Sequence, residues 1–307
     1  VDIHLAQSND NGNHWTYAGP LWQSHSIKNP VSGAENFTSY EVANIWPQNQ
    51  NGKTVWYAIH LYYLAKPNSF IYSQLGGYSY FSLSMASSPT ELANAPSQIL
   101  GFGGTVKGLG PDVNLSSFHS DLANCTIWNE PALTMQGNTL YLAAQCLSAS
   151  GSKLVPEKNF YAIFSTRPQG DIKTWQWQYR GKLAGPAEAA ELENHQFWVQ
   201  LDFAKKTDGT LLAILTPSEV GNTEHDKHYG CRVLQIASLD SPALARDASG
   251  KLIVLASITA SDLMTSVGPA ACNYEPSATT GIIMTRRLSN DPVQGYYWTL
   301  HKTGLKP

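Results

Sequence analysis

Four acidic residues recur along this 307-residue chain and are the first candidates for chemistry. They are Glu41, Glu130, Asp202 and Glu275, at spacings of 89, 72 and 73 residues. Each belongs to or borders a strand-like run that leads through a glycine turn into a strongly apolar strand. Carboxyl groups brought together raise one another's pKa, so one could stay protonated as a general acid while another acts as the base. Cleavage of a glycosidic bond needs such a pair. The alternative is structural: the acids accept hydrogen bonds from strand amides or bind a structural cation.

Aromatic residues near these acids are candidates for contact with a substrate. The candidates are Trp46, Trp128, Trp198 and His60. An exposed indole ring can stack on a sugar ring, although most aromatic residues of a β fold fill the space between sheets. No metal or other cofactor is expected, because the one histidine-rich segment, His225-Asp226-Lys227-His228, matches no standard zinc spacing.

The repeated unit predicts an all-β fold. Hydrophobic residues make up 42% of the chain and charged residues only 14%, while Gly (24), Pro (17) and Tyr (15) are plentiful. These proportions favour pleated strands and tight turns over solvated helices. Repeats of about 70–90 residues suit the blades of a β-propeller, each blade with four antiparallel strands. We expect a five-bladed propeller, with a four-bladed ring as the alternative and a two-layer β-sandwich as the competing fold.

The two ends of the chain carry complementary parts of the repeated unit. Residues 1–6 and 14–17 read as a hairpin with no acidic strand before it, and the last unit ends at residues 296–300 without a fourth strand. We therefore expect residues 1–307 to form a single propeller domain closed by strands from both termini. The count of strands also predicts that part of the first blade lies upstream of Val1.

Charge and hydropathy exclude two classes of partner. The net charge is −3 and no run of Lys or Arg is present, so the sequence predicts no nucleic-acid binding. The longest apolar run, residues 55–64, is interrupted by His60 and is shorter than the about 20 residues of a membrane span.

The cysteines predict two disulfides. Cys125, Cys146, Cys231 and Cys272 are an even set without a CxxC pair, which speaks against a zinc ribbon or a thioredoxin-type site. The expected pairs are Cys125–Cys146 and Cys231–Cys272, each joining a residue near an inner strand to a neighbouring strand; four free buried thiols are the alternative. Disulfides favour a secreted protein, extracellular or periplasmic.

The most specific motif lies in the first hairpin. Ser8-Asn9-Asp10-Asn11-Gly12-Asn13-His14-Trp15 matches the Asp-box pattern S/T-x-D-x-G-x-x-W. We expect Asp10 to accept hydrogen bonds from turn amides, Gly12 to supply a positive φ and Trp15 to pack between sheets. The motif resembles those of sialidases and related propellers, and the chain as a whole is similar to bacterial sialidase-like proteins. This resemblance implies a fold and not a reaction, and the few arginines argue against sialidase activity.

A second resemblance concerns Glu41. Ser39-Tyr40-Glu41-Val42, followed by a glycine turn and an aromatic strand, resembles the carboxylate strand of five-bladed arabinanase-, xylosidase- and levansucrase-like glycosidases, although Tyr40 stands where those enzymes have proline. The resemblance implies a glycoside hydrolase with carboxylates in a central funnel and Glu41 as the most important of them. The alternative is a non-catalytic propeller that binds a glycan or a protein partner. The sequence leaves open whether the chain is an enzyme.

Overall fold

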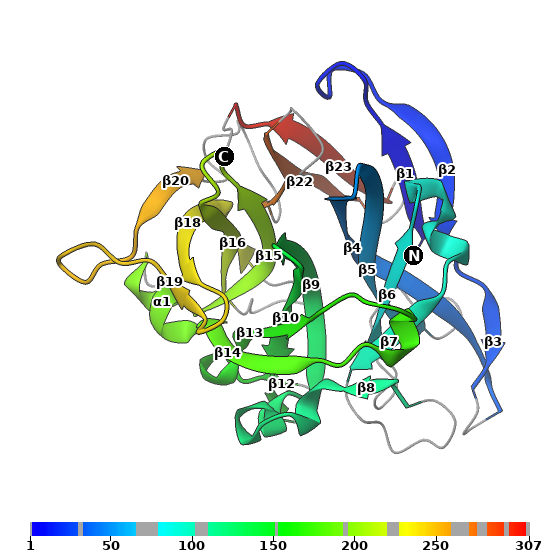
Figure 1. Cartoon of the computed structure of the whole chain (residues 1–307), viewed down its shortest axis with the longest axis horizontal. Coiled ribbons are helices and arrows are strands. Elements are labelled where there is room, and N and C mark those ends of the chain that lie inside the picture. The colour runs from blue at the N-terminus through cyan, green and yellow to red at the C-terminus, as the bar shows by residue number, and fades with distance from the viewer. Residues whose placement is uncertain are drawn as a thin grey trace. The chain divides into compact units, whose positions relative to one another are not determined.

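The computed structural model describes residues 2–29, 33–65, 79–101, 110–150, 153–192, 196–219, 227–258, 270–274, 281–291 and 295–304. The described part of the chain is almost entirely β-strand, with short helical turns and one short α-helix, so the all-β expectation is confirmed (Figure 1). The chain divides into two compact units. Unit 1 comprises residues 1–142 and 165–179, and unit 2 comprises residues 143–164 and 180–307.

Unit 1 is built on a six-stranded sheet in the order β3-β4-β5-β6-β7-β8. Neighbouring strands are antiparallel, except that β7 and β8 are parallel. The strands are β3 (Ser26–Lys28), β4 (Glu35–Gln50), β5 (Lys53–Ala65), β6 (Ser79–Ala86), β7 (Ser97–Gly101) and β8 (Val113–Asn114). The middle of this sheet is apolar and buried, as shown by Tyr57, Ile59 and Phe81 at 0% exposure. Burial of the central strands on both faces explains why they read as continuous apolar runs.

The long hairpin of β4 and β5 turns at Asn51-Gly52, as the sequence predicts. Gln50 pairs with Lys53, which leaves a two-residue loop, and Asn51 and Gly52 have φ values of 53° and 80°. Two successive positive φ angles make a turn whose twist matches that of paired strands, and Asn-Gly is the preferred sequence for it. The Asn49 Oδ1 atom accepts a hydrogen bond from the Gly52 amide at 3.0 Å, which fixes the loop further.

The first hairpin pairs β1 (Ile3–Gln7) with β2 (Thr16–Trp22) in a sheet of their own. The hydrogen bonds predicted for Asp10 are present, because its Oδ1 atom accepts from the Asn13 and His14 amides at 3.1 and 2.8 Å, and Gly12 has φ 72°. The packing predicted for Trp15 is wrong: its side chain is 45% exposed. Six of the seven residues of the adjoining strand β2 are also exposed or half-buried, so this part of the hairpin is open on the described structure.

A four-stranded sheet has the order β14-β13-β10-β9, and the division between the units crosses its strands. They are β9 (Ile127–Gln136), β10 (Thr139–Leu147), β13 (Phe160–Thr166) and β14 (Gln178–Ala184). Every residue of β13 is buried, and so is all of β10 except Thr139. The 3-10 turns of unit 1 are η1 (Pro89–Asn94), η2 (Leu115–Ser117), η3 (Ser120–Asn124) and η5 (Ile172–Thr174).

Unit 2 contains a larger antiparallel sheet and a three-stranded one. The larger sheet follows the path β15-β16-β18-β19, with β17 on β16 and β20 on β18, and the smaller has the order β21-β22-β23. The elements of unit 2 are β11 (Ala149–Ser150), β12 (Lys153–Leu154), η4 (Pro156–Lys158), α1 (Pro186–Glu191), β15 (Phe197–Lys205), β16 (Leu211–Glu219), β17 (Lys227–His228), β18 (Cys231–Ser238), β19 (Ala243–Leu244), β20 (Val254–Ile258), β21 (Ala270–Tyr274), β22 (Ile282–Asp291) and β23 (Gly295–Lys302).

All four cysteines are disulfide-bonded, as predicted. Cys231 on β18 is bonded to Cys272 on β21, which ties the two sheets of unit 2 together inside an apolar cluster that includes Leu212 and Ile282. Cys125 and Cys146 are the other bonded cysteines. Two disulfides are typical of proteins that fold in an oxidising compartment.

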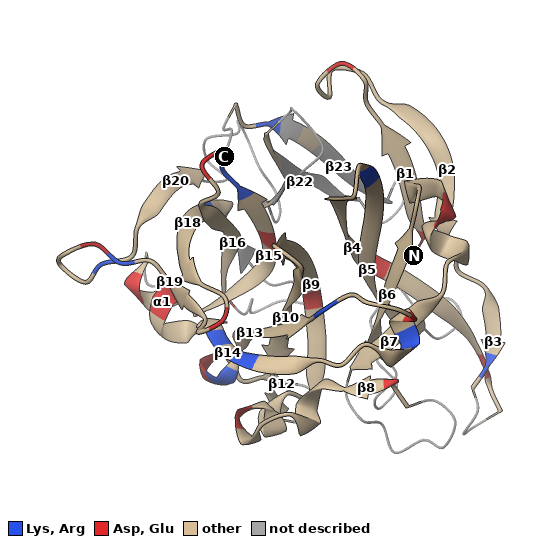
Figure 2. Cartoon of the chain, viewed as in Figure 1, with Lys and Arg blue, Asp and Glu red and all other residues tan. Residues whose placement is uncertain are grey.

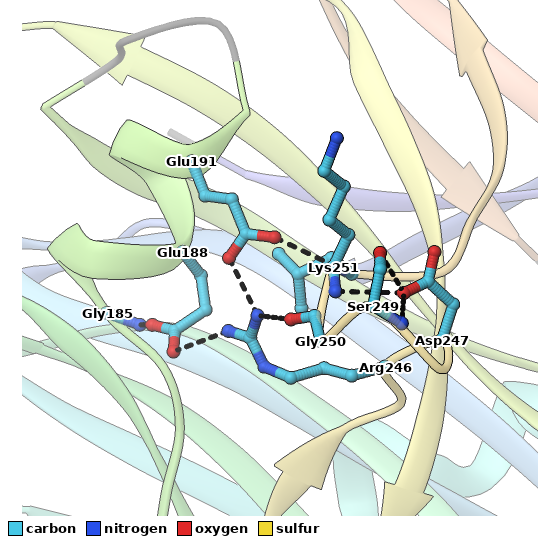
Figure 3. A network of polar contacts seen from close by, with 9 residues as sticks. Gly185, Glu188, Glu191, Arg246, Asp247, Ser249, Gly250 and Lys251 are labelled. Carbon is cyan, nitrogen blue, oxygen red and sulfur yellow. Dashed lines mark hydrogen bonds and ion pairs between the residues drawn. The ribbon is translucent and has the colours of Figure 1, made fainter.

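A polar network fixes α1 to the segment before β20 (Figure 3). The Arg246 guanidinium donates to Glu191 Oε2 at 2.8 Å and to the Gly250 carbonyl at 2.7 Å, and lies 3.9 Å from Glu188 Oε1. Glu191 also accepts a hydrogen bond from the Leu252 amide at 2.9 Å. The Leu252 amide and then Arg246 lower the pKa of Glu191, so its carboxylate stays charged and the network is structural.

Acidic and basic residues both occur on the described strands, turns and loops (Figure 2). In the part of the chain that the structure describes, no helix has the length and apolar character that a membrane span requires.

Candidate functional site

The structure places the predicted acids in different parts of the fold. Glu41 lies on β4 and Glu130 on β9, both in unit 1, whereas Asp202 lies on β15 in unit 2. Glu275 lies outside the described residues. The convergence of all four on one funnel therefore stays a prediction, and the site that can be built from described residues is the pair Glu41 and Glu130.

Both strands of this pair carry an unusual backbone feature beside the acid. Val42 has φ 53° and Glu130 has φ 45°, in the left-handed region that residues other than glycine rarely adopt. On β4 the pairing shifts between Glu41 and Asn44, so that Val42 and Ala43 together lie opposite His60 of β5. This is a β-bulge, which re-aims side chains locally and is frequent beside active sites.

The same left-handed conformation occurs on β15. Gln200 has φ 52°, and the register of β15 with β16 shifts at this residue. The acids lie at different offsets from these residues: Glu41 precedes Val42, Glu130 is itself left-handed, and Asp202 follows Gln200 by two. Equivalent places for the acids in repeated units stay a prediction.

The left-handed backbone at Glu130 has no decisive signal in the sequence. Proline follows it at position 131. Proline has no amide hydrogen for a sheet ladder and is confined to strand edges, first positions and bulges. Because β9 is an edge strand of its sheet, Pro131 fits that position without a bulge.

The electrostatics of the pair distinguish its two members. Glu130 is half-buried, and burial first and the nearby charge of Glu41 second raise its pKa to about 8. At pH 7 a group with this pKa is about nine-tenths protonated. Glu130 therefore carries a proton that it can donate, whereas an ordinary glutamate at this pH has none.

His60 lies on β5, opposite the bulge of β4 that follows Glu41, and contacts two aromatic rings. It is 2% exposed, its ring centroid lies 4.2 Å from that of Trp22 and 5.5 Å from that of Tyr40, and burial lowers its pKa to about 4. The imidazole is thus neutral at pH 7. Its Nδ1 atom lies 3.4 Å from the Leu61 carbonyl, which can only accept, so Nδ1 carries the hydrogen and Nε2 is the acceptor.

Asn44 connects the two strands that carry the acids. Its Oδ1 atom accepts a hydrogen bond from the Leu133 amide at 2.9 Å. Asn44 follows Glu41 by three residues on β4, and Leu133 follows Glu130 by three residues on β9. β4 and β9 belong to different sheets, so this bond helps to fix the separation of the two carboxyl groups.

The three tryptophans predicted to contact a substrate are buried. Trp46, Trp128 and Trp198 are 5%, 0% and 2% exposed. The Trp128 Nε1 atom donates to Ser116 Oγ at 3.0 Å. These rings fill the core in this structure, and contact with a sugar would require a face of the ring to be accessible.

Asp202 shows the structural behaviour that was the alternative for all the acids. Its side chain is 3% exposed and its Oδ1 atom accepts a hydrogen bond from the Phe203 amide at 2.8 Å. Within the described ranges, no group of three or more His, Cys, Asp or Glu side chains could hold a metal ion. His225 and Asp226 lie outside those ranges.

The comparisons with known proteins give remote structural likeness only. No protein-family model and no curated protein matches the sequence. Among solved structures, an exo-1,5-α-L-arabinanase from a bovine ruminal metagenomic library is 8% identical with a TM-score of 0.45, and 84% of this chain covers 69% of that one. A sucrose-6-phosphate hydrolase from Lactobacillus gasseri is 11% identical with a TM-score of 0.47, and 94% of this chain covers 49% of that one. A third structure, described under the GH130 family of mannoside phosphorylases and glycoside hydrolases, is 10% identical with a TM-score of 0.44. The match covers 90% of this chain and 70% of that one. These similar structures are glycoside hydrolases by description, and the function of this chain has to be argued from its own side chains.

Proposed function

We propose that the chain is a glycoside hydrolase in which Glu130 is the general acid and Glu41 the charged partner. The observation that carries the proposal is the pKa of Glu130, raised to about 8 by burial and by Glu41. Two carboxyl groups whose environments separate their pKa values are the usual basis of an acid and base assignment. The sequence resemblance implies that Glu41 is the most important carboxylate. The raised pKa of Glu130 supports Glu130 as the residue that donates the proton.

In the proposed reaction, Glu130 donates its proton to the glycosidic oxygen as the bond to the anomeric carbon breaks. In an inverting enzyme, Glu41 removes a proton from the water that attacks the anomeric carbon. In a retaining enzyme, the Glu41 carboxylate attacks that carbon itself, and water activated by Glu130 then releases the sugar. The separation of the carboxyl groups in a complex with substrate decides between these outcomes: roughly 5–5.5 Å for retention and 6.5–9.5 Å for inversion.

Two features of the surroundings support these roles. Glu130 holds a left-handed backbone conformation, which costs about 1–3 kcal/mol for a non-glycine residue and is found mainly where function or the fold imposes it. His60 is neutral and therefore adds no positive charge that would lower the pKa of the two acids. A propeller architecture, a contribution of Asp202 and Glu275, a glycan as the ligand and secretion belong to the same proposal.

The test is hydrolysis of a panel of arabino-, xylo-, fructo- and sialo-glycosides by the wild type and by Glu130→Gln. Loss of a general acid typically lowers the rate by 10²–10⁴-fold. The loss should be smaller for aryl glycosides whose leaving group needs no protonation, whereas Glu41→Gln should impair both classes of substrate. Glu157→Gln, which changes an exposed carboxylate of unit 2, is the matched control and should keep full activity.

The competing function is a non-catalytic propeller that binds a glycan or a protein. Binding of a glycan by the wild type without turnover of any panel member would favour this alternative. Hydrolysis that survives Glu130→Gln on every substrate would leave an enzyme but refute the assignment of its acid.

A further inference from the structure

A cavity of about 350 Å³ lies in unit 1, away from the carboxyl pair. Three segments line it: the end of β4 with its turn, the end of β9 with its turn, and the segment between β13 and β14. The lining residues are Gln48, Asn49, Gln50, Asn51, Met135, Gly137, Asn138, Pro168 and Gln169. β9 contacts both β4 and β5, which brings the hairpin ends together.

The cavity is separate from the proposed active site. Glu130 and Met135 lie five residues apart on β9, which corresponds to about 17 Å along an extended strand. Glu41 and Gln48 lie seven residues apart on β4, or about 23 Å. A ligand in this cavity would not touch the carboxyl pair.

The lining has one dominant chemistry. Six of its nine residues are asparagine or glutamine, and none carries a charge. A carboxamide offers both a hydrogen-bond donor and an acceptor, as a hydroxyl group does, and it compensates no net charge. Met135 and Pro168 add apolar surface that the C–H face of a sugar ring could cover.

Several of these amides are held in place by the protein. The Gln50 Nε2 atom donates to the Tyr57 hydroxyl at 2.6 Å, and the Gln48 Nε2 atom donates to the Asn49 carbonyl at 3.3 Å. Asn49 Oδ1 accepts from the Gly52 amide. Each bond orders a side chain of the lining, so part of the entropy cost of ordering these side chains on binding is already met.

We propose that this cavity is an accessory binding site for a neutral sugar. Its volume is at the small end of the about 300–1,000 Å³ found for small-molecule sites, which suits one or two sugar rings and not a folded partner. Among its described lining residues there is no Asp, Glu or His, and the proposal is therefore for binding and not for cleavage. The proposal stands whether or not the carboxyl pair is catalytic.

The test is a titration of the ¹⁵N-labelled protein with arabinose, xylose, fructose and their oligosaccharides, observed by NMR through the side-chain amides. A site of this size should bind with a dissociation constant on the order of 1 mM. We expect the amide signals of Gln48, Asn49 and Gln169 to shift in the wild type and equally in Glu130→Gln. The acidic sugars glucuronate and N-acetylneuraminate should not shift them.

Gln169→Ala removes an exposed loop side chain and should weaken binding by about 3- to 10-fold, the value of one hydrogen bond. Gln178→Ala, which removes an exposed glutamine that does not line the cavity, is the control and should leave binding unchanged. Three results would overturn the proposal. They are shifts confined to residues around Glu130, stronger binding of the acidic sugars or of a peptide, and no shift of these amides at a sugar concentration 50 times the expected dissociation constant. Because activity is not the readout, failure of this proposal is distinct from failure of the catalytic one.

Discussion

Replacing Glu130 by glutamine should change how stability depends on pH, in a way that needs no substrate. The folded-state pKa of Glu130, about 8, lies above its ordinary value of 4.5. A raised pKa means that the folded protein holds a proton that the unfolded chain has already lost. The stability linked to this proton is fully present below pH 4.5 and is lost as the pH rises through 8, at up to about 1.4 kcal/mol per pH unit.

His60 acts in the opposite direction over a lower range. Its pKa is lowered from 6.5 to about 4, so the folded protein binds fewer protons than the unfolded chain between these values. Its contribution is present above pH 6.5 and is lost as the pH falls toward 4. Between pH 4.5 and 6.5 the two effects largely cancel, and between pH 6.5 and 8 the Glu130 effect alone should lower the free energy of unfolding by about 2 kcal/mol.

Glutamine at position 130 keeps the shape of the side chain and removes its titration. Urea unfolding followed by tryptophan fluorescence at pH 4.5, 5.5, 6.5, 7.5 and 8 measures both proteins. The difference in unfolding free energy, Glu130→Gln minus wild type, should rise by about 4 kcal/mol across this range. A flat difference for Glu130→Gln would refute the raised pKa and with it the assignment of the acid.

Three further substitutions test the links that hold the units and the site. Asn44→Ala deprives the Leu133 amide of its partner, so it should cost about 1–3 kcal/mol of stability in urea unfolding; Asn44→Asp, which keeps the acceptor oxygen, should cost less. Replacing Cys231 and Cys272 together by alanine opens a 41-residue loop, and calorimetry should show a loss of about 4 kcal/mol; reduction of the wild type, which opens both disulfides, should cost more. Arg246→Ala removes a partly exposed network and should cost about 1 kcal/mol or less; a loss several times larger would mean that α1 depends on it.

The strands were predictable because their signals are local. Runs such as residues 139–144 and 210–215 are apolar and follow a glycine turn, and both became buried strands. The Asn51-Gly52 turn and the Asp10 hydrogen bonds depend on residues within a few positions of each other. Each of these features is determined by backbone preferences that a short segment already contains.

The exposure of Trp15 and of the tryptophans near the acids could not be predicted from local sequence. The hairpin motif specifies the turn but not what covers its face, so Trp15 remained exposed where packing was expected. The burial of Trp46, Trp128 and Trp198 depends on neighbouring elements far away in the sequence. Exposure is therefore a tertiary property that residue type predicts poorly.

The sequence identifies the two acids of the candidate site but not their backbone conformation or their pKa values. Glu41 and Glu130 follow from the repeat in the sequence, whereas the bulge on β4 and the left-handed backbone at Glu130 leave little trace in the spacing. The raised pKa of Glu130 needs both burial and the approach of Glu41 from 89 residues away. The carboxamide cavity escaped prediction for the same reason, since its lining comes from three separated segments.

The most direct measurement is an NMR titration of the Glu130 side-chain carboxyl carbon, assigned by comparison with Glu130→Gln, in the wild type and in Glu41→Gln. The account predicts a midpoint near pH 8 in the wild type. In Glu41→Gln the midpoint should fall, because repulsion by Glu41 is lost, and should stay above 4.5, because burial remains the larger cause. A wild-type midpoint near 4.5, or one that Glu41→Gln leaves unchanged, would contradict the central claim that these two carboxyl groups form an acid and its charged partner.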